Sequence, residues 1–199
     1  MNAPEKLELI KPSIEYSAQY LAMVDEGIET GEGYGYNNVE LAREDFAAFV
    51  QELEDESQGI GLPTGLPAQQ TYFLLKEGQM VVGEIRFRPA ITPPYEKYNG
   101  HIAYNIRPSQ RGKGYATRQL ALVLQEARKL GLPFVTLTVE NDNPASVRVI
   151  QKNGGKLLQT IENPLKVQVR EREGRWVVED VKEAGVTSNL YLIELASPQ

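Results

Sequence analysis

The hydrophobic positions in the N-terminal part of the chain follow a strand pattern and then two helix patterns. The short apolar run LELI at residues 7–10 is typical of a strand. After Pro12, apolar residues recur at helical spacing as far as Ile28, which predicts a first helix. Asn38 is a suitable N-cap for a second helix, in which apolar residues form one stripe over 39–53.

The middle of the chain alternates between strand and helix patterns. Strands are expected at 71–76 and 80–88, joined by the turn EGQ, and at 100–106 and 134–139. One helix is expected from the RGKG loop to about Lys129, and another from Asn143-Pro144 to Gly154. Loop composition marks residues 57–70 and 89–99.

The C-terminal part alternates between apolar and polar residues over four further segments. Strands are expected at 156–161, 167–172, 175–181 and 189–195, and the EG pair at 173–174 makes the middle two a hairpin. This order of elements predicts a mixed α/β domain. With 199 residues, of which 41% are hydrophobic, the chain can bury the core of one domain covering residues 1–199.

Composition excludes several classes of protein. There is no cysteine, which excludes disulfides and thiol nucleophiles and fits a cytoplasmic location. The single histidine argues against a zinc enzyme, and no metal site is expected. The net charge of −6 makes a nucleic-acid partner unfavourable. No apolar run is long enough to span a membrane, and the charged N-terminus does not fit a signal peptide.

The stretch RGKG stands between an expected strand and an expected helix. Glycines let backbone amides approach a ligand, and a helix N-terminus offers unpaired N–H groups at the positive end of its dipole. Arg111 and Lys113 add positive charge, so residues 111–117 predict a phosphate-binding loop. The alternative is an ordinary strand-to-helix turn with exposed charges. The spacing fits neither the P-loop nor the dinucleotide fingerprint.

Two segments carry a family resemblance. Arg111-Gly112-Lys113-Gly114-Tyr115-Ala116 matches the pattern R/Q-x-x-G-x-G/A after a strand, and FVTLTVENDNPASVRVIQKNGGKL matches a strand and helix with N-x-x-S before K-x-G. In this order and separation, over residues 80–158, the chain resembles the GNAT N-acetyltransferase superfamily. The spellings GYAT and ASxRVIxKNGG resemble the branch that contains ribosomal-protein N-acetyltransferases and small-molecule acetyltransferases.

The resemblance implies a fold and a reaction. The fold would be the acyl-CoA N-acyltransferase fold, here with an extra C-terminal β-hairpin at about 166–181 and with its cofactor-binding core at 80–158. The reaction would be transfer of an acetyl group from acetyl-CoA to a primary amine, with a small molecule as the expected acceptor. A protein N-terminus as acceptor and a non-catalytic acyl-CoA sensor remain open as alternatives.

The resemblance also assigns a cofactor site. Main-chain groups at the end of the strand before the loop would hold the pantetheine arm, and backbone amides of the loop would hold the pyrophosphate. An asparagine and a serine at the start of the following helix would contact the same arm, besides the capping role that the sequence itself gives to the asparagine. These residues are Asn105, Ile106, Arg107, Arg111, Gly112, Lys113, Gly114, Tyr115, Ala116, Thr117, Asn143 and Ser146.

Three residues are candidates for catalysis. Glu84 lies mid-strand, where alternation places it on one face with Val82 and Arg86. It is either a general base of raised pKa or the partner of Arg86 or Arg88 in an ion pair on an exposed sheet face. His101 is either a base or a satisfied polar residue at a strand start. Tyr104 either lines the acceptor pocket or packs in the core.

The family pattern is incomplete where many members have a tyrosine that protonates the leaving thiolate. Ile150 takes that position, and Gly155 replaces the usual aromatic residue after the helix, so solvent would supply this proton. Tyr34 and Tyr36 are candidates for the acceptor pocket, with loop packing as the alternative. The extra hairpin leaves three roles open: an edge for a homodimer, a lid, or neither.

Overall fold

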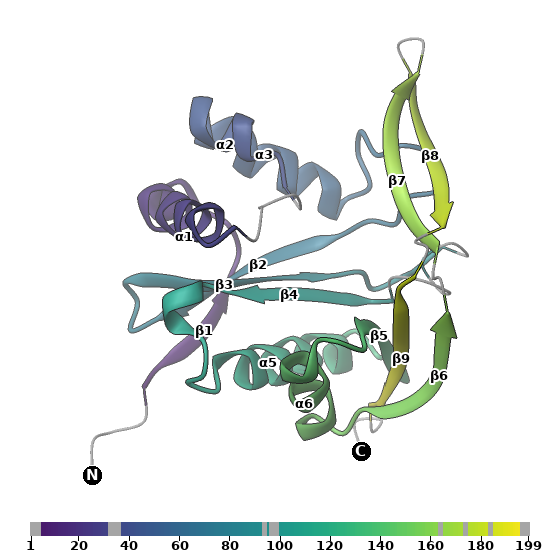
Figure 1. Cartoon of the computed structure of the whole chain (residues 1–199). Coiled ribbons are helices and arrows are strands. Elements are labelled where there is room, and N and C mark those ends of the chain that lie inside the picture. Colours follow the sequence, from purple (N-terminus) through teal and green to yellow (C-terminus); the bar gives the residue numbers. More distant parts are fainter. Residues whose placement is uncertain are drawn as a thin grey trace.

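Two antiparallel sheets form the frame of the molecule, as Figure 1 shows for the computed structural model. The structure describes residues 5–31, 37–92, 95, 100–162, 165–172, 175–182 and 185–195. The first sheet has the order β1 (Leu7–Ile10), β2 (Gln70–Lys76), β3 (Met80–Phe87) and β4 (Ile102–Ile106). The second has the order β5 (Phe134–Glu140), β9 (Thr187–Glu194) and β6 (Lys156–Glu162). A separate hairpin is formed by β7 (Leu165–Arg172) and β8 (Arg175–Lys182), which confirms the extra hairpin.

Helices cover both faces of the first sheet (Figure 1). On one face lie α1 (Ser17–Glu29), α2 (Val39–Glu44) and α3 (Phe46–Ser57), which enclose a core around Tyr20, Phe49 and Phe73. On the other face lie α5 (Tyr115–Lys129) and α6 (Pro144–Lys152), whose apolar sides pack with Ile85 and Phe87. The fold class predicted from the sequence is therefore confirmed.

Two predicted helices differ from the observed ones at their boundaries. The first begins with a single 3₁₀ turn, Ile14–Tyr16, before α1. The second is divided into α2 and α3, because Asp45 adopts an extended conformation (φ −146°, ψ 94°) and its carboxylate accepts the N–H of Ala48 (3.0 Å) as an N-cap. The predicted cap at Asn38 is confirmed by its bond from the N–H of Leu41 (3.1 Å).

A β-bulge changes the faces of β3. The register between β2 and β3 shifts between Leu74 and Leu75, so Val82 is the extra residue on β3. Val82 consequently packs beside Tyr115 under α5, whereas Glu84 contacts Asn37 on the side of α1. The expectation that Val82, Glu84 and Arg86 share one face was wrong for Val82.

The two sheets meet at the start of β4. The N–H of His101 donates to the carbonyl of Thr136 on β5 (2.8 Å), and Gly100 forms an isolated bridge with Leu137. Gly100 has φ +67°, and a Cβ there would stand 2.5 Å from the Thr136 carbonyl oxygen, so the approach requires glycine. From this junction onwards β4 and β5 belong to separate sheets, which leaves the end of β4 at Ile106 free to line a cavity.

Candidate functional site

A cavity of about 590 Å³ opens where β4 ends. Its walls are the last residues of β4, the segment from Pro108 to Gly114, the first turn of α5 and one side of α6, while Met23 and Gly27 of α1 close it from the opposite sheet face. Most residues predicted for the cofactor site line this cavity: Asn105, Ile106, Arg107, Arg111, Gly112, Gly114, Tyr115, Ala116, Thr117, Asn143 and Ser146.

The glycine loop presents main chain to the cavity. Gly112 (φ +75°) and Gly114 (φ +80°) both adopt the left-handed conformation, and a Cβ at either position would meet nothing within 4 Å. Gly114 is the N-cap residue of α5 and has no side chain to occupy the first N–H groups of the helix. The loop therefore offers backbone donors and the positive end of a helix dipole to an anion in the cavity.

The charged residues of the loop are held by local hydrogen bonds. Arg111 donates from Nε to the carbonyl of Ile106 (3.0 Å), which ties the loop to the end of β4. Lys113 does not line the cavity; its Nζ donates to the Ser109 carbonyl (3.1 Å) and to Oε1 of Gln110 (2.9 Å).

Tyr115 supports the loop from behind. Its ring is buried in an apolar cluster with Ile106, and its hydroxyl donates to the carboxylate of Glu5. The Lys76 ammonium lies 5.5 Å from the ring centroid. Tyr115 thus anchors the first residue of α5 against the sheet.

Glu26 on α1 binds Arg107 and Ser109, which follow the end of β4. Its Oε2 lies 2.6 Å from Nε of Arg107, and it accepts both the main-chain N–H and the hydroxyl of Ser109. Burial raises the pKa of Glu26, but the bonds from Arg107 and Ser109 outweigh burial and leave this pKa below its ordinary value. The side chain of Arg107 is therefore half-buried and takes part in an ion pair.

Glu26 was not predicted from the sequence. An acidic residue in the last turn of a helix is unfavourable next to the negative end of the dipole, and this was the one local signal for it.

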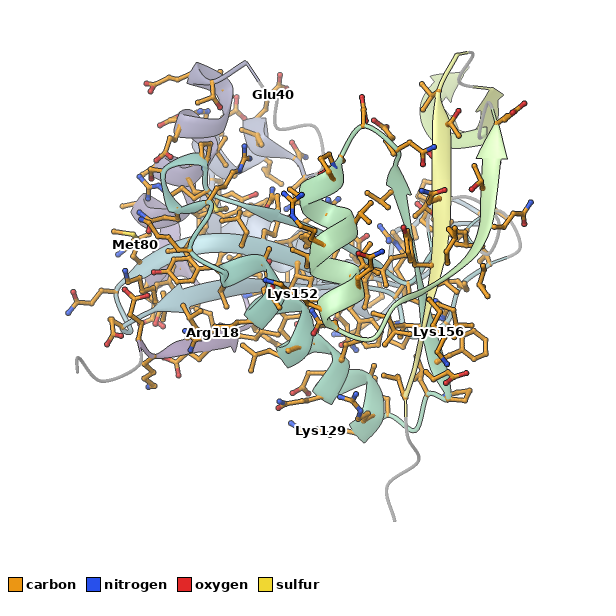
Figure 2. All side chains as sticks on the ribbon, turned by 60° about the horizontal axis from the view of Figure 1, so that its bottom comes forward. Glu40, Met80, Arg118, Lys129, Lys152 and Lys156 are labelled. Atoms are coloured by element: carbon orange, nitrogen blue, oxygen red, sulfur yellow. The ribbon has the colours of Figure 1, made fainter. Side chains whose placement is uncertain are left out.

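Helix α6 forms a further wall of the cavity, and Asn153 at its C-terminal end donates to the carbonyl of Thr117 in the first turn of α5 (3.2 Å). Asn143 accepts the N–H of Ser146 (3.0 Å), which confirms its capping role. Arg148 and Lys152, one turn apart, also line the cavity, and neither forms an ion pair with another residue that the structure describes. Figure 2 shows Lys152 on the helix beside α5. These two cations, also missed from the sequence, suit an anionic ligand.

Tyr104 is the one catalytic candidate that lines the cavity. Burial raises the pKa of its phenol, which lies 3.5 Å from the carbonyl of Ser146. The phenol therefore remains protonated at neutral pH, and it can donate a hydrogen bond there.

Glu84 is buried on the α1 side of the sheet, one layer behind the cavity. Its Oε2 accepts from Nδ2 of Asn37 (2.8 Å), and its Oε1 lies 3.4 Å from Nε of Arg86. Burial raises the pKa of Glu84 despite the nearby Arg86 and the hydroxyl of Tyr20. The expected ion pair with Arg86 is present, but the expected exposed face is not, because α1 covers it. A catalytic role of Glu84 stays a prediction.

His101 lies at the junction of the sheets and does not line the cavity. Its Nδ1 accepts the N–H of Thr136 (3.1 Å), so the ring proton resides on Nε2. Burial and the nearby Arg88 lower the pKa of His101 to about 4. This geometry matches the satisfied polar residue at a strand start; a role as base stays a prediction.

The missing tyrosine has a structural reason. Ile150 is buried in the main core, and a Cβ on Gly155 would stand 2.3 Å from Cγ2 of Ile150, so neither position can present a phenol to the cavity. Tyr34 and Tyr36 lie outside the described residues. Within the described part of the chain, no helix is long and apolar enough to cross a membrane.

Comparison with known proteins identifies a family for this chain and finds solved structures with a similar fold. The acetyltransferase (GNAT) domain family matches residues 7–156. L-methionine sulfoximine/L-methionine sulfone acetyltransferases of Pseudomonas aeruginosa and Pseudomonas paraeruginosa are 28% identical over 86 residues, which are 42% of this chain and 47% of each relative. The match thus spans about half the length of these curated relatives.

Two solved structures are similar to this fold over nearly the whole chain. A ribosomal-protein alpha-N-acetyltransferase in complex with coenzyme A has a TM-score of 0.65 at 17% identity and covers 96% of each chain. The microcin C7 self-immunity acetyltransferase, in complex with acetyl-CoA and AMP, has a TM-score of 0.63 at 15% identity and covers 95% of this chain and 92% of its own. At such identities, these similarities show the fold alone.

Proposed function

The chain belongs to the acetyltransferase (GNAT) domain family, and we propose that it transfers the acetyl group of acetyl-CoA to the primary amine of a small molecule. The observation that carries this proposal is the cavity at the end of β4, where a left-handed glycine loop, a helix N-terminus and the cations Arg148 and Lys152 converge. Acetyl-CoA supplies an activated thioester and an anionic phosphate-bearing arm.

The residues present fit such a donor. Gly112 and Gly114 have positive φ angles and no atom within 4 Å of a Cβ position, so the loop leaves room for a pyrophosphate beside its amides. Arg148 and Lys152 add positive charge on the wall that α6 forms. Main-chain groups of β4 between Asn105 and Arg107 line the cavity on the side where the acyl group would be oriented.

Two side chains are assigned to the acceptor amine. Glu84 does not line the cavity, so it would accept the proton of the amine through an intervening water, and its raised pKa brings the carboxylate closer to neutral pH than an ordinary glutamate. Tyr104, in the cavity wall, would orient the acceptor through its phenol. His101 is better suited to hold β4 against β5 than to act as a base.

A small-molecule acceptor is favoured by the curated relatives, which act on methionine sulfoximine and methionine sulfone. A protein N-terminus remains the nearest variant, and an acyl-CoA sensor without turnover is the alternative from another class. We also propose that the protein is cytoplasmic, since it has no cysteine.

Release of free CoA in the presence of an amine panel tests the proposal. Amine-dependent release by the wild type, lost in a Gly114→Asp variant, would support an enzyme that uses this cavity. Binding of acetyl-CoA without release from any amine would favour the sensor. Release from peptides alone would favour the protein N-terminus.

A further inference from the structure

Gln119 is a buried amide without a hydrogen bond. It lies in the second turn of α5, its side chain is 0% exposed, and neither Nε2 nor Oε1 has a partner among the described residues. Three nearby residues of the helix are apolar and belong to the main core: Leu120, Val123 and Leu124. A buried amide that forms no bond destabilises the fold, so its presence at this position requires another explanation.

The amide points at the strand edge that lines the cavity. Nε2 lies 3.0 Å from the point where a Cβ on Gly83 would stand, and the main-chain oxygen of Asn105 lies 2.7 Å from the same point. Cδ1 of Ile106 is also 2.7 Å from it. Because residue 83 is glycine, the amide and the β4 main chain share the space that a side chain would otherwise fill.

A side chain takes part in the pairing of β3 with β4 at this place. The N–H of Glu84 donates to the side-chain oxygen of Asn105 (3.0 Å), so that the side chain takes part in the ladder between β3 and β4. Val82, the bulged residue of β3, accepts the N–H of Arg107 (2.9 Å). The edge from Asn105 to Arg107 is therefore held by an unusual set of bonds beside the free amide of Gln119.

We propose that Gln119 is a positioning residue for the acyl donor. A small movement of the β4 edge towards α5 brings the Asn105 carbonyl within range of the Nε2 donor. In that position the edge of β4 presents Asn105 and Ile106 to the cavity while the Nε2 donor of Gln119 is paired. The donor, held by the edge of β4, would bind this position more tightly, and its binding would shift the population towards the paired amide. This inference rests on the proposed function of the cavity.

The proposal predicts opposite effects of one substitution on stability and on binding. Gln119→Met keeps the length of the side chain and removes both polar atoms. The midpoint of thermal unfolding of the free protein is expected to stay unchanged or to rise, because no bond is lost. The Kd for acetyl-CoA by calorimetry is expected to rise about tenfold, equivalent to about 1.4 kcal/mol. In turnover, KM for acetyl-CoA should rise with kcat little changed.

Leu120→Met is the matched control, because Leu120 is the next residue of α5 and its side chain packs in the main core. The Kd of this variant for acetyl-CoA should equal that of the wild type. If the Gln119 amide has no role in binding, the Gln119→Met protein will bind acetyl-CoA like the wild type. That result would overturn the inference. Loss of stability in that variant would also overturn it, since the free amide would then have a bond to lose.

The inference and the proposed function fail in different ways. If the wild type binds no acetyl-CoA, both fail. If the wild type binds, Gly114→Asp does not, and Gln119→Met binds like the wild type, then the cavity assignment stands and only the role of Gln119 is refuted.

Discussion

Acidification should destabilise the protein through His101. In the folded state this imidazole is buried beside Arg88 and its Nδ1 accepts a bond from Thr136, so its pKa is lowered from the ordinary value of 6.5 to about 4. The unfolded chain therefore binds a proton as pH falls below 6.5, while the folded chain does not until about 4. Linkage then requires stability to be complete above pH 6.5 and to decline as pH falls towards 4.

The size of this effect follows from the same pKa values. The gap between them corresponds to a loss of about 3 kcal/mol in the free energy of unfolding, at about 1.4 kcal/mol for each pH unit. That is a large share of the stability of an ordinary domain. Because the bond between His101 and Thr136 lies where β4 meets β5, its loss should separate the two sheets at their junction.

Urea unfolding at several pH values measures this loss. Carboxylates also titrate in this range, so the comparison is with His101→Asn, whose side-chain oxygen can still accept the Thr136 N–H but does not titrate. The difference between the two proteins should grow by about 3 kcal/mol from pH 7 to pH 4. Parallel curves would refute the lowered pKa. Loss of turnover at pH 7–9 in His101→Asn would instead make His101 the base.

Three further predictions concern the cavity. Gly114→Asp should abolish acetyl-CoA binding, because it places a carboxylate at the loop. Gly131→Asp, which is also at positive φ but lies at the far end of α5, should bind normally, and equal binding by both variants would contradict the loop assignment. Glu26→Gln should raise KM for acetyl-CoA about tenfold by releasing Arg107, with Glu29→Gln as the neutral control. Glu84→Gln should lower kcat and remove the acidic limb of the pH–rate profile; an unchanged profile would exclude Glu84 as the base.

Local sequence signals were sufficient for most of the elements and for the glycine loop. Asn143-Pro144 marks a helix start through capping chemistry that acts within a few residues, and the structure has this cap. The family resemblance supplied the rest of the fold, because it relates segments that no local rule connects. The extent of a single domain over the whole chain stays a prediction.

The features that the sequence did not predict depend on contacts between distant segments. Glu26 meets Arg107 across 81 residues of chain, and its place in the last turn of α1 does not indicate which residue it pairs with. The bulge at Val82 arises from the pairing of β3 with β2, so alternation within β3 alone assigned one face wrongly. The free amide of Gln119 is visible only once α5 is packed against Gly83.

Calorimetric titration of acetyl-CoA into the wild-type protein, beside free CoA and beside the Gly114→Asp variant, tests the central claim most directly. We expect saturable binding with a Kd on the order of micromolar for the wild type, and no binding by the variant. Absence of binding by the wild type, or equal binding by the variant, would contradict the assignment of the cavity at the end of β4 to the acyl donor.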